Sequence, residues 1–333
     1  MTTQIFKILC LGTGLVQTLL MFVLLQGGYA DQAASHTDDL PVFRVGYLPV
    51  LSQLPLIISY DRDRYSYENI RIELVEFKSY IALEAAFRVQ AIDIAYLPVP
   101  TILKMKVDGV AVLIGDSLHR GGFSMVIGAG SAGKINGRAI FGIPGFAGNG
   151  QLILGDYLAD SGGSYGKNYR TITVQLSDAE AVIERGQVDG IIFPEPYPTK
   201  VLVHVPGLER IVRGQHSRLY TLQSALVFNR ERLSGNMRGL LEWLESLEKS
   251  CIFLAEDIDQ YEGAQTVISQ QRYFGFDMAL VRDALNYPGR SLSFSPERIT
   301  KVELEKVVEK MISEKLLPNS LNLDNVLLRT YFP

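Results

Sequence analysis

The stretch VIERGQVDGIIFPEPY, residues 182–197, combines the end of a helix, a short apolar strand and a loop. Gly186 is suited to end the helix, because glycine readily adopts the left-handed conformation found there. The strand is predicted at residues 188–193, and Pro194 and Pro196 stiffen the loop that follows it. This pattern is typical of one unit of an α/β protein.

A second stretch, AFRVQAIDIAYLPVPT at residues 86–101, repeats the pattern. When the two stretches are aligned, three pairs coincide: Asp93 with Asp189, Pro98 with Pro194, and Pro100 with Pro196. Two copies predict two similar lobes, each with a loop at the carboxyl end of a strand, where open α/β sheets bind ligands. The alternative is chance similarity between two ordinary helix–strand junctions. A period seen only twice does not indicate a solenoid array.

Length and composition fit this interpretation. The chain has 333 residues, which suits one large domain or two ordinary ones, and 47% of them are hydrophobic, enough for a sizeable core. The formal net charge is −4 and no basic patch is present, so the sequence argues against nucleic-acid binding.

The first thirty residues differ from the rest. Lys7 is the only charged residue before Asp31, and residues 8–25 are nearly all apolar. The triplet GYA at residues 28–30 places small residues at the two positions that a signal peptidase reads. A secretory signal removed after Ala30 is predicted, which puts the protein in the periplasm or on the extracellular side. The apolar run is also long enough to span a bilayer, so a retained membrane anchor is the alternative.

The order of predicted elements indicates a mostly parallel sheet in the first part of the chain. Strands are predicted at residues 43–48, 70–76, 92–97, 110–114, 124–127, 139–143, 172–175, 188–193, 202–205 and 222–228. Helices are predicted at residues 54–60, 79–89, 101–107, 151–159, 237–253, 260–272, 278–285 and 296–316. Residues 177–180 read as a capping box, and Ser295 as the cap of the last helix. The final four helices form a tail that can cover one lobe.

Four glycines lie between a predicted strand and a predicted helix: Gly142, Gly145, Gly148 and Gly150. Such a loop lets backbone N–H groups face a ligand at the start of a helix. The spacing does not match the dinucleotide or phosphate-loop fingerprints. A tight turn without a ligand is the alternative.

Four other side chains are candidates to contact a ligand. Glu195 lies between two prolines, and Arg120 follows the fourth strand. Tyr96 lies in the predicted strand of its unit, and Tyr197 is the last residue of the other unit. The alternatives are a solvated acid, two core tyrosines and a surface arginine. The four histidines are scattered and no metal-ligand or catalytic spacing occurs, so we expect no metal, no cofactor and no catalytic residue.

Four segments resemble the nitrate/sulfonate/taurine-type (thiamine-pyrimidine-precursor-like) periplasmic substrate-binding proteins of ABC transporters: VGYLP…LPLIIS, AIDIAYLPVPTIL, GRAIFGIPGFAGNGQLIL and AVIERGQVDGIIFPEPY. The resemblance covers nearly the whole mature chain. It implies a two-lobed α/β periplasmic binding fold of the second type, with the ligand cleft between the lobes and a C-terminal helical tail. Lobe one would comprise residues 31–123 and 223–333, and lobe two residues 124–222, with hinges near Phe123 and Ser224.

Carried over position by position, the resemblance implies ligand contacts on both lobes. In lobe one they fall on Ser52, Gln53, Lys78, Ser79, Tyr80, Tyr96 and Leu97, and in lobe two on Gly145, Gly148, Asn149, Gly150 and Glu195. Residues 77–79 read FKS, where members of the family often carry a glycine-containing anion loop. This departure, together with the Glu195 carboxylate, favours a neutral or cationic nitrogen-bearing ligand such as a pyrimidine over a bare oxyanion.

The function that the resemblance implies is extracytoplasmic solute binding, not catalysis. The protein would act as a monomer that closes on a small polar molecule and delivers it to the membrane permease of an ABC importer. One alternative is an enzyme of the thiamine-pyrimidine synthesis type, which belongs to the same superfamily. That enzyme is intracellular and carries a cysteine-rich motif, whereas this chain has a signal and only Cys251 after it. The other alternative is a ligand-sensing protein that feeds a receptor.

Overall fold

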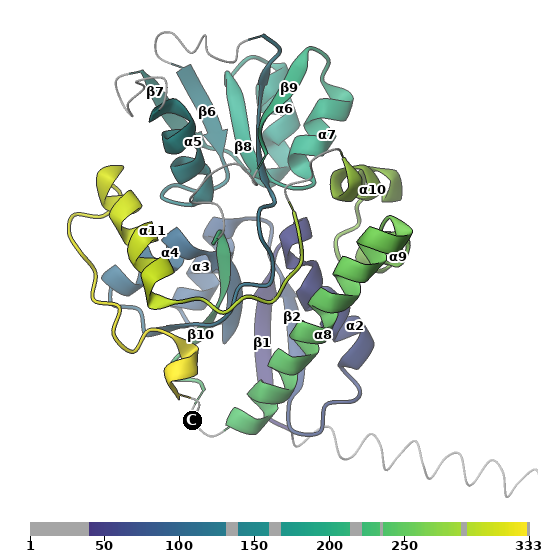
Figure 1. The fold of residues 1–333 in the computed structure, drawn as a ribbon, viewed down its shortest axis with the longest axis vertical. Coiled ribbons are helices and arrows are strands. Elements are labelled where there is room, and N and C mark those ends of the chain that lie inside the picture. The colour runs from purple at the N-terminus through teal and green to yellow at the C-terminus, as the bar shows by residue number, and fades with distance from the viewer. Residues whose placement is uncertain are drawn as a thin grey trace, which may run out of the picture.

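The computed structural model describes residues 40–130, 139–159, 168–213, 222–233, 236–287 and 292–331. These residues form two lobes, one above the other in Figure 1, and each lobe contains a five-stranded sheet with helices packed on it. The two-lobed α/β fold predicted from the sequence is confirmed. The predicted secretory signal, residues 1–30, lies outside the described residues.

The sheet of the lower lobe has the strand order β2-β1-β3-β10-β4. Its strands are β1 (Val42–Tyr47), β2 (Arg71–Glu76), β3 (Ile94–Pro98), β4 (Val112–Ile114) and β10 (Ser224–Asn229). Strands β2 and β3 run parallel to β1, whereas β10 is antiparallel to both β3 and β4. The chain therefore leaves this sheet after β4 and returns to its interior more than a hundred residues later as β10.

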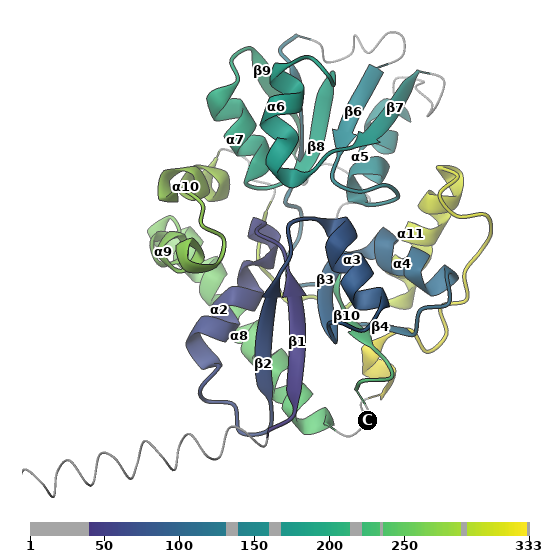
Figure 2. The same cartoon turned by 180° about the vertical axis from the view of Figure 1, so that it is seen from behind.

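Helices cover both faces of this sheet. One face packs against α2 (Leu54–Asp63) and α8 (Met237–Tyr261), and the other packs against α3 (Tyr80–Arg88), α4 (Val99–Val107) and α11 (Lys301–Ser313). Figure 2 shows α3 and α4 in front of the sheet, seen from behind the view of Figure 1. Because both faces are covered, the strands β3 and β10 are buried along their whole length.

The sheet of the upper lobe has the strand order β7-β6-β8-β5-β9. Its strands are β5 (Phe123–Gly128), β6 (Ala139–Ile143), β7 (Tyr169–Thr173), β8 (Gly190–Pro194) and β9 (Leu208–Arg213). Helix α5 (Asn149–Ala159) packs on one face, and α6 (Ala179–Glu184) and α7 (Tyr197–His204) pack on the other. Strand β5 is antiparallel to its neighbours, as β10 is in the lower lobe. The lobe boundaries near residues 123 and 223 stay a prediction.

The two sequence copies occupy equivalent positions in the two sheets. Asp93 lies just before β3, and its carboxylate accepts a hydrogen bond of 2.9 Å from the Arg44 backbone N–H on the neighbouring strand. Asp189 lies just before β8, and its carboxylate accepts one of 2.7 Å from the Ile140 backbone N–H. Each aspartate also donates its own backbone N–H to the carbonyl of the same neighbour. The matched aspartates therefore fix the same strand register twice.

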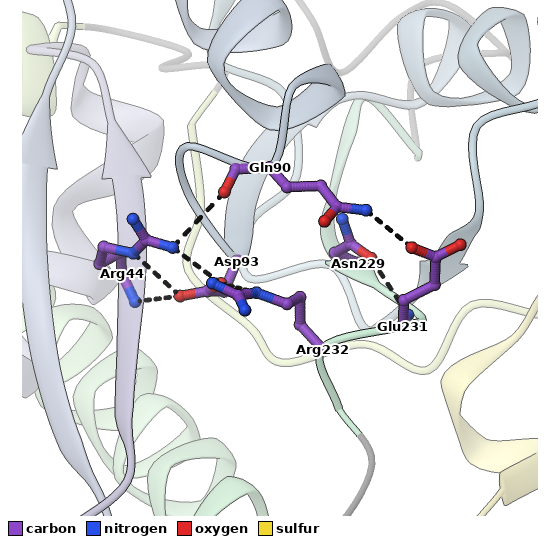
Figure 3. Close-up of polar contacts among 6 residues, drawn as sticks. All are labelled: Arg44, Gln90, Asp93, Asn229, Glu231 and Arg232. Carbon is purple, nitrogen blue, oxygen red and sulfur yellow. Dashed lines mark hydrogen bonds and ion pairs between the residues drawn. The ribbon is translucent and has the colours of Figure 1, made fainter.

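The surroundings of the two aspartates differ. Asp93 has a side chain only 4% exposed and forms ion pairs with Arg44 and Arg232, as Figure 3 shows. Gln90 joins this cluster because its carbonyl accepts a hydrogen bond from Arg44 and its side chain donates one of 2.8 Å to Glu231. Asp189 is exposed. The cluster thus ties β1, the turn before β3 and the segment after β10 together.

We expect Asp93→Ala to cost about 3 kcal/mol of folding free energy and Asp189→Ala about 1 kcal/mol, because only Asp93 is buried and charge-paired. Urea unfolding of the two variants beside the native chain measures the difference. If the two variants lose equal amounts of stability, the shared hydrogen bond to the neighbouring strand explains both losses. The ion pairs of Asp93 with Arg44 and Arg232 would then contribute nothing measurable.

The C-terminal tail contains α8, α9 (Ala264–Tyr273), α10 (Met278–Asn286) and α11. The prediction that the last helix starts at Pro296 with Ser295 as cap is wrong. It starts at Lys301, because Thr300 and Glu303 form a capping box. The residues before it are extended, and the backbones of Ser293 and Glu297 bond to those of Arg120 and Ser117.

Two further predictions are wrong in the upper lobe. Residues 202–205 belong to the end of α7, and the strand follows at β9, because a short apolar run does not distinguish a helix from a strand. The capping box at residues 177–180 does not form. The hydroxyl of Ser177 bonds to the Asp178 carboxylate, while the carboxylate of Glu180 pairs with Lys200 and His204.

Candidate ligand site between the lobes

The loops at the carboxyl ends of the parallel strands of both sheets face each other across the boundary between the lobes. The Leu51 backbone N–H, after β1, donates to the Glu195 carbonyl, after β8, at 2.8 Å. A methyl group added to Gly145, after β6, would lie 3.9 Å from the Cβ of Tyr80 at the start of α3. One added to Gly148 would lie 3.9 Å from the Thr101 hydroxyl in α4. The two copies of the sequence unit thus contribute to one interface.

Aromatic side chains line one part of this interface. Tyr80 and Tyr197 are buried, and the ring of Tyr197 meets that of Phe276, from the tail, edge to face with centroids 5.7 Å apart. Burial raises the pKa of both tyrosines above their usual value, so their hydroxyls stay protonated at neutral pH. Both tyrosines can therefore donate a hydrogen bond as well as pack against a ring.

Glu195 is held by the protein itself. Its side chain is fully buried and pairs with Arg210, and it also accepts hydrogen bonds from the Ser124 hydroxyl at 3.1 Å and the Thr199 hydroxyl at 2.7 Å. A solvated loop acid is therefore excluded. Since an ionised carboxylate only accepts hydrogen bonds, these partners already satisfy it. A contact from Glu195 to a ligand stays a prediction, but the geometry gives the residue a structural role.

Arg210 was missed by the sequence prediction, because β9 was placed too early in the chain. It donates to the Thr199 hydroxyl at 2.8 Å and lies over the ring of Tyr287, 4.0 Å from its centroid. Tyr287 follows α10, so this contact joins the upper lobe to the tail. No sequence motif identifies Arg210. It lies near Glu195 because β9 and β8, the strand before the Glu195 loop, belong to the same sheet.

Arg120 pairs with Glu297 of the tail, and its side chain is 31% exposed. The arginine beside Glu195 is Arg210, and a contact from Arg120 to a ligand stays a prediction. Lys78 is exposed and pairs with Glu76, and the hydroxyl of Ser79 caps α3 as the sequence predicted.

Several predicted contact residues brace the lower lobe. Gln53 accepts a hydrogen bond from the Leu48 backbone and donates one to the Tyr96 carbonyl. The hydroxyl of Tyr96 accepts from the Leu118 backbone N–H at 2.9 Å. Ser52 and Leu97 are buried in the same region. In the upper lobe, Gly150 of α5 packs closely on Ile143 of β6. Whether these residues also touch a ligand stays a prediction.

A small cavity lies where both lobes and the tail meet. Its walls are Pro100, Asn149, Leu152, Leu222, Gln223, Val307 and Lys310. Asn149 and Gln223 are 4% and 1% exposed, and neither the Asn149 Nδ2 nor the amide atoms of Gln223 has a hydrogen-bond partner. Asn149 belongs to the predicted glycine loop, whereas Gln223 was not predicted.

Lys310 connects α11 to the upper lobe through an ion pair with Asp156 of α5, and it also pairs with Glu314 at the end of α11, at 2.9 Å. Burial lowers the pKa of Lys310, but the hydrogen bonds to the two carboxylates outweigh it, and the net shift is upward. Lys310 is therefore a charged but neutralised group in the cavity wall.

In the part of the chain that the structure describes, no cluster of histidine, cysteine or acidic residues is arranged to hold a metal ion. The helices described there include none that could cross a membrane.

The pair of sheets with an inserted antiparallel strand in each, joined around an interlobe site, defines the fold of periplasmic binding proteins. The ligand-binding component of an ABC-type import system from Staphylococcus aureus, solved with zinc bound, has a similar structure, with a TM-score of 0.74, 16% identity and coverage of 84% of this chain and 94% of that one. Residues 37–213, more than half of the chain, match the family model described as the NMT1-like family, so the chain belongs to that family. The resemblance seen in the sequence is confirmed.

Two other similar structures belong to periplasmic binding proteins. The nitrate-binding protein of Synechocystis PCC 6803 has a TM-score of 0.71 at 14% identity and covers 85% of this chain and 83% of its own. The aliphatic sulphonate-binding protein of Escherichia coli has a TM-score of 0.69 at 13% identity and covers 88% and 99%. No curated protein sequence matches this chain.

Proposed function

We propose that the protein is an extracytoplasmic solute-binding protein that takes up a small molecule between its lobes and presents it to the permease of an ABC importer. The observation that carries the proposal is the convergence of the strand-end loops of both sheets on one interface. Leu51 meets Glu195 there, and Tyr80 meets Gly145. The names of the similar structures support it, since each is a binding component of an import system or a periplasmic binding protein.

Binding would act through a change in the separation of the lobes. Among the described residues, side-chain contacts that join the upper lobe to the tail include Lys310 with Asp156, Phe276 with Tyr197, and Tyr287 with Arg210. A ligand that touches both lobes stabilises the arrangement in which these contacts form, and its absence leaves the lobes freer to separate. Separation would open the interface and admit the solute.

A thermal-shift screen tests the proposal. Protein expressed from the full-length sequence is heated with nitrate, taurine, an alkanesulfonate, bicarbonate, pyrimidines and carboxamides in turn. We expect at least one compound to stabilise the fold, by about 2.7 kcal/mol at a hundredfold excess over its Kd. Small-angle scattering should then show a smaller radius of gyration with that compound. Chemical turnover of the compound would overturn the proposal and favour an enzyme.

We also propose that the chain is exported and that its mature form begins at Asp31. The apolar run at residues 8–25 and the small residues at 28–30 support this. Mass spectrometry of the protein from the cell envelope measures the N-terminus. An envelope-bound chain that keeps Met1 would show a retained anchor, and a cytosolic one would overturn the proposed location.

A further inference from the structure

The cavity between the lobes and the tail is assembled from four separate parts of the chain. Pro100 comes from α4, Asn149 and Leu152 from α5, and Gln223 from the segment just before β10. The fourth part is α11, which supplies Val307 and Lys310. Figure 1 shows α4, α5 and α11 on the same side of the molecule. A compound in this cavity would therefore touch both lobes and the tail at once.

The two amides in the wall are the unusual feature of the cavity. A buried amide without a hydrogen-bond partner costs about 1–3 kcal/mol relative to one that has a partner. Asn149 leaves its Nδ2 donor unpartnered, and Gln223 leaves both its Nε2 donor and its Oε1 acceptor unpartnered. The buried amides of Gln53 and Gln270, in contrast, have hydrogen-bond partners within the protein. The unpartnered set consists of two donor groups beside one acceptor.

The charges around the cavity are already balanced within the protein. Lys310 is the cation in the wall, and it is shared by Asp156 and Glu314. Pro100, Leu152, Leu222 and Val307 make the rest of the wall apolar. A buried anion needs a charge partner as well as hydrogen bonds, so this wall disfavours an oxyanion.

We propose that the cavity binds a neutral solute that carries a carbonyl next to an N–H, as in a carboxamide, a urea, a lactam or a pyrimidinone. The carbonyl oxygen would accept hydrogen bonds from the amides of Asn149 and Gln223, and the N–H would donate to Gln223 Oε1. A nitrate or sulfonate would take the two donors but leave Gln223 Oε1 facing negative charge. The proposal rests on the proposed solute-binding function and names the chemical class of its ligand.

Entry of the solute requires movement of the lobes. In the packed arrangement the cavity has room for about one water molecule. The direct tie across it is the ion pair between Lys310 and Asp156, which joins α11 to α5. Movement of α5 away from α11 opens this pair and widens the space beside both amides.

Gln223→Met tests the inference, because methionine has a similar length and shape but no amide. Protein expressed from the full-length sequence is used, and its thermal shift is measured with acetamide, urea, 2-pyrrolidone, uracil and cytosine, and separately with nitrate and taurine. We expect one of the neutral compounds to bind the native protein. Its Kd should rise about 100-fold in Gln223→Met and about tenfold in Asn149→Ala, since one or two buried hydrogen bonds are lost. Without a ligand, Gln223→Met should melt at the native temperature or above it.

The matched control is Gln151→Met. Gln151 is as buried as Gln223, but its Oε1 accepts a hydrogen bond of 2.9 Å from the Thr171 hydroxyl and it does not line the cavity. This variant should melt at a lower temperature and keep the native Kd for the neutral compound. The opposite melting behaviour of the two variants separates a lost ligand contact from general damage to the fold.

Each other outcome contradicts the inference in a distinct way. A shift with nitrate or taurine that survives Gln223→Met would leave the proposed function standing and overturn the ligand class. Binding of a neutral compound that is unchanged in Gln223→Met would place the ligand elsewhere. No shift with any compound would mean that the amides hold a buried water only, and would count against the proposed function as well.

Discussion

Replacing Glu195 by glutamine is expected to destabilise the folded protein by about 3–5 kcal/mol, because Arg210 then remains buried without a counter-charge. The side chains of Glu195 and Arg210 are 0% and 10% exposed, so water cannot compensate for the loss. Urea unfolding measures the effect in the absence of any ligand. If Glu195 acted only as a ligand contact, Glu195→Gln would weaken ligand binding but would not lower the stability of the ligand-free protein.

The double variant Glu195→Gln/Arg210→Met tests whether the loss of stability in Glu195→Gln comes from the unpaired charge of Arg210. We expect it to recover part of the stability lost in Glu195→Gln, because both charges are then removed from the interior. The matched control is Glu297→Gln, which breaks the pair with Arg120, where the side chains are 26% and 31% exposed. That change should cost less than about 1 kcal/mol. A loss of similar size in Glu195→Gln would show that the Arg210 pair is solvated.

The free energy of unfolding is expected to fall as the pH decreases from about 6.5 to about 4, and we expect buried His119 to be a main cause. His119 is fully buried beside Tyr96, in the segment that follows β4, and both of its ring nitrogens lack a hydrogen-bond partner. Burial lowers the pKa of His119 from 6.5 to about 4. Between these two values the unfolded chain binds a proton that the folded chain does not, so folding free energy is lost as the pH falls.

Protonation of His119 in the unfolded chain should lower the free energy of unfolding by about 2 kcal/mol between pH 7 and pH 5. His119→Phe removes the titrating group but keeps an aromatic ring. The loss of stability between pH 7 and pH 5 should therefore be about 2 kcal/mol smaller in this variant than in the native chain. Urea unfolding at both pH values gives the comparison. If His119→Phe loses as much stability as the native chain, another group is responsible.

These two sites illustrate why the sequence could not predict all of the chemistry. Glu195 stood out because prolines flank it, and the loop was predicted at the right place. Its partner Arg210 comes from a strand whose position was misread, and nothing in the letters around Arg210 points to a buried pair. His119 lies in an ordinary polar segment, HRGG, and the fold buries it beside Tyr96 of β3.

Local patterns in the sequence were enough to predict the α/β class, the two lobes and most strands and helices. It could do so because the alternation of apolar residues, the caps and the repeated Asp–strand–Pro unit act locally. The cap at Ser79 and the matched pair of Asp93 and Asp189 depend on residues close in the chain or repeated in it.

Which polar groups meet between the lobes depends on how the chain packs in three dimensions. Gln223 and Asn149 are far apart in the chain, and Lys310 reaches Asp156 from the tail. Such meetings depend on where β10 re-enters the first sheet and where α11 packs, which are long-range consequences of burying the helix faces. A cavity is the space left after that packing, so no single stretch of the sequence encodes it.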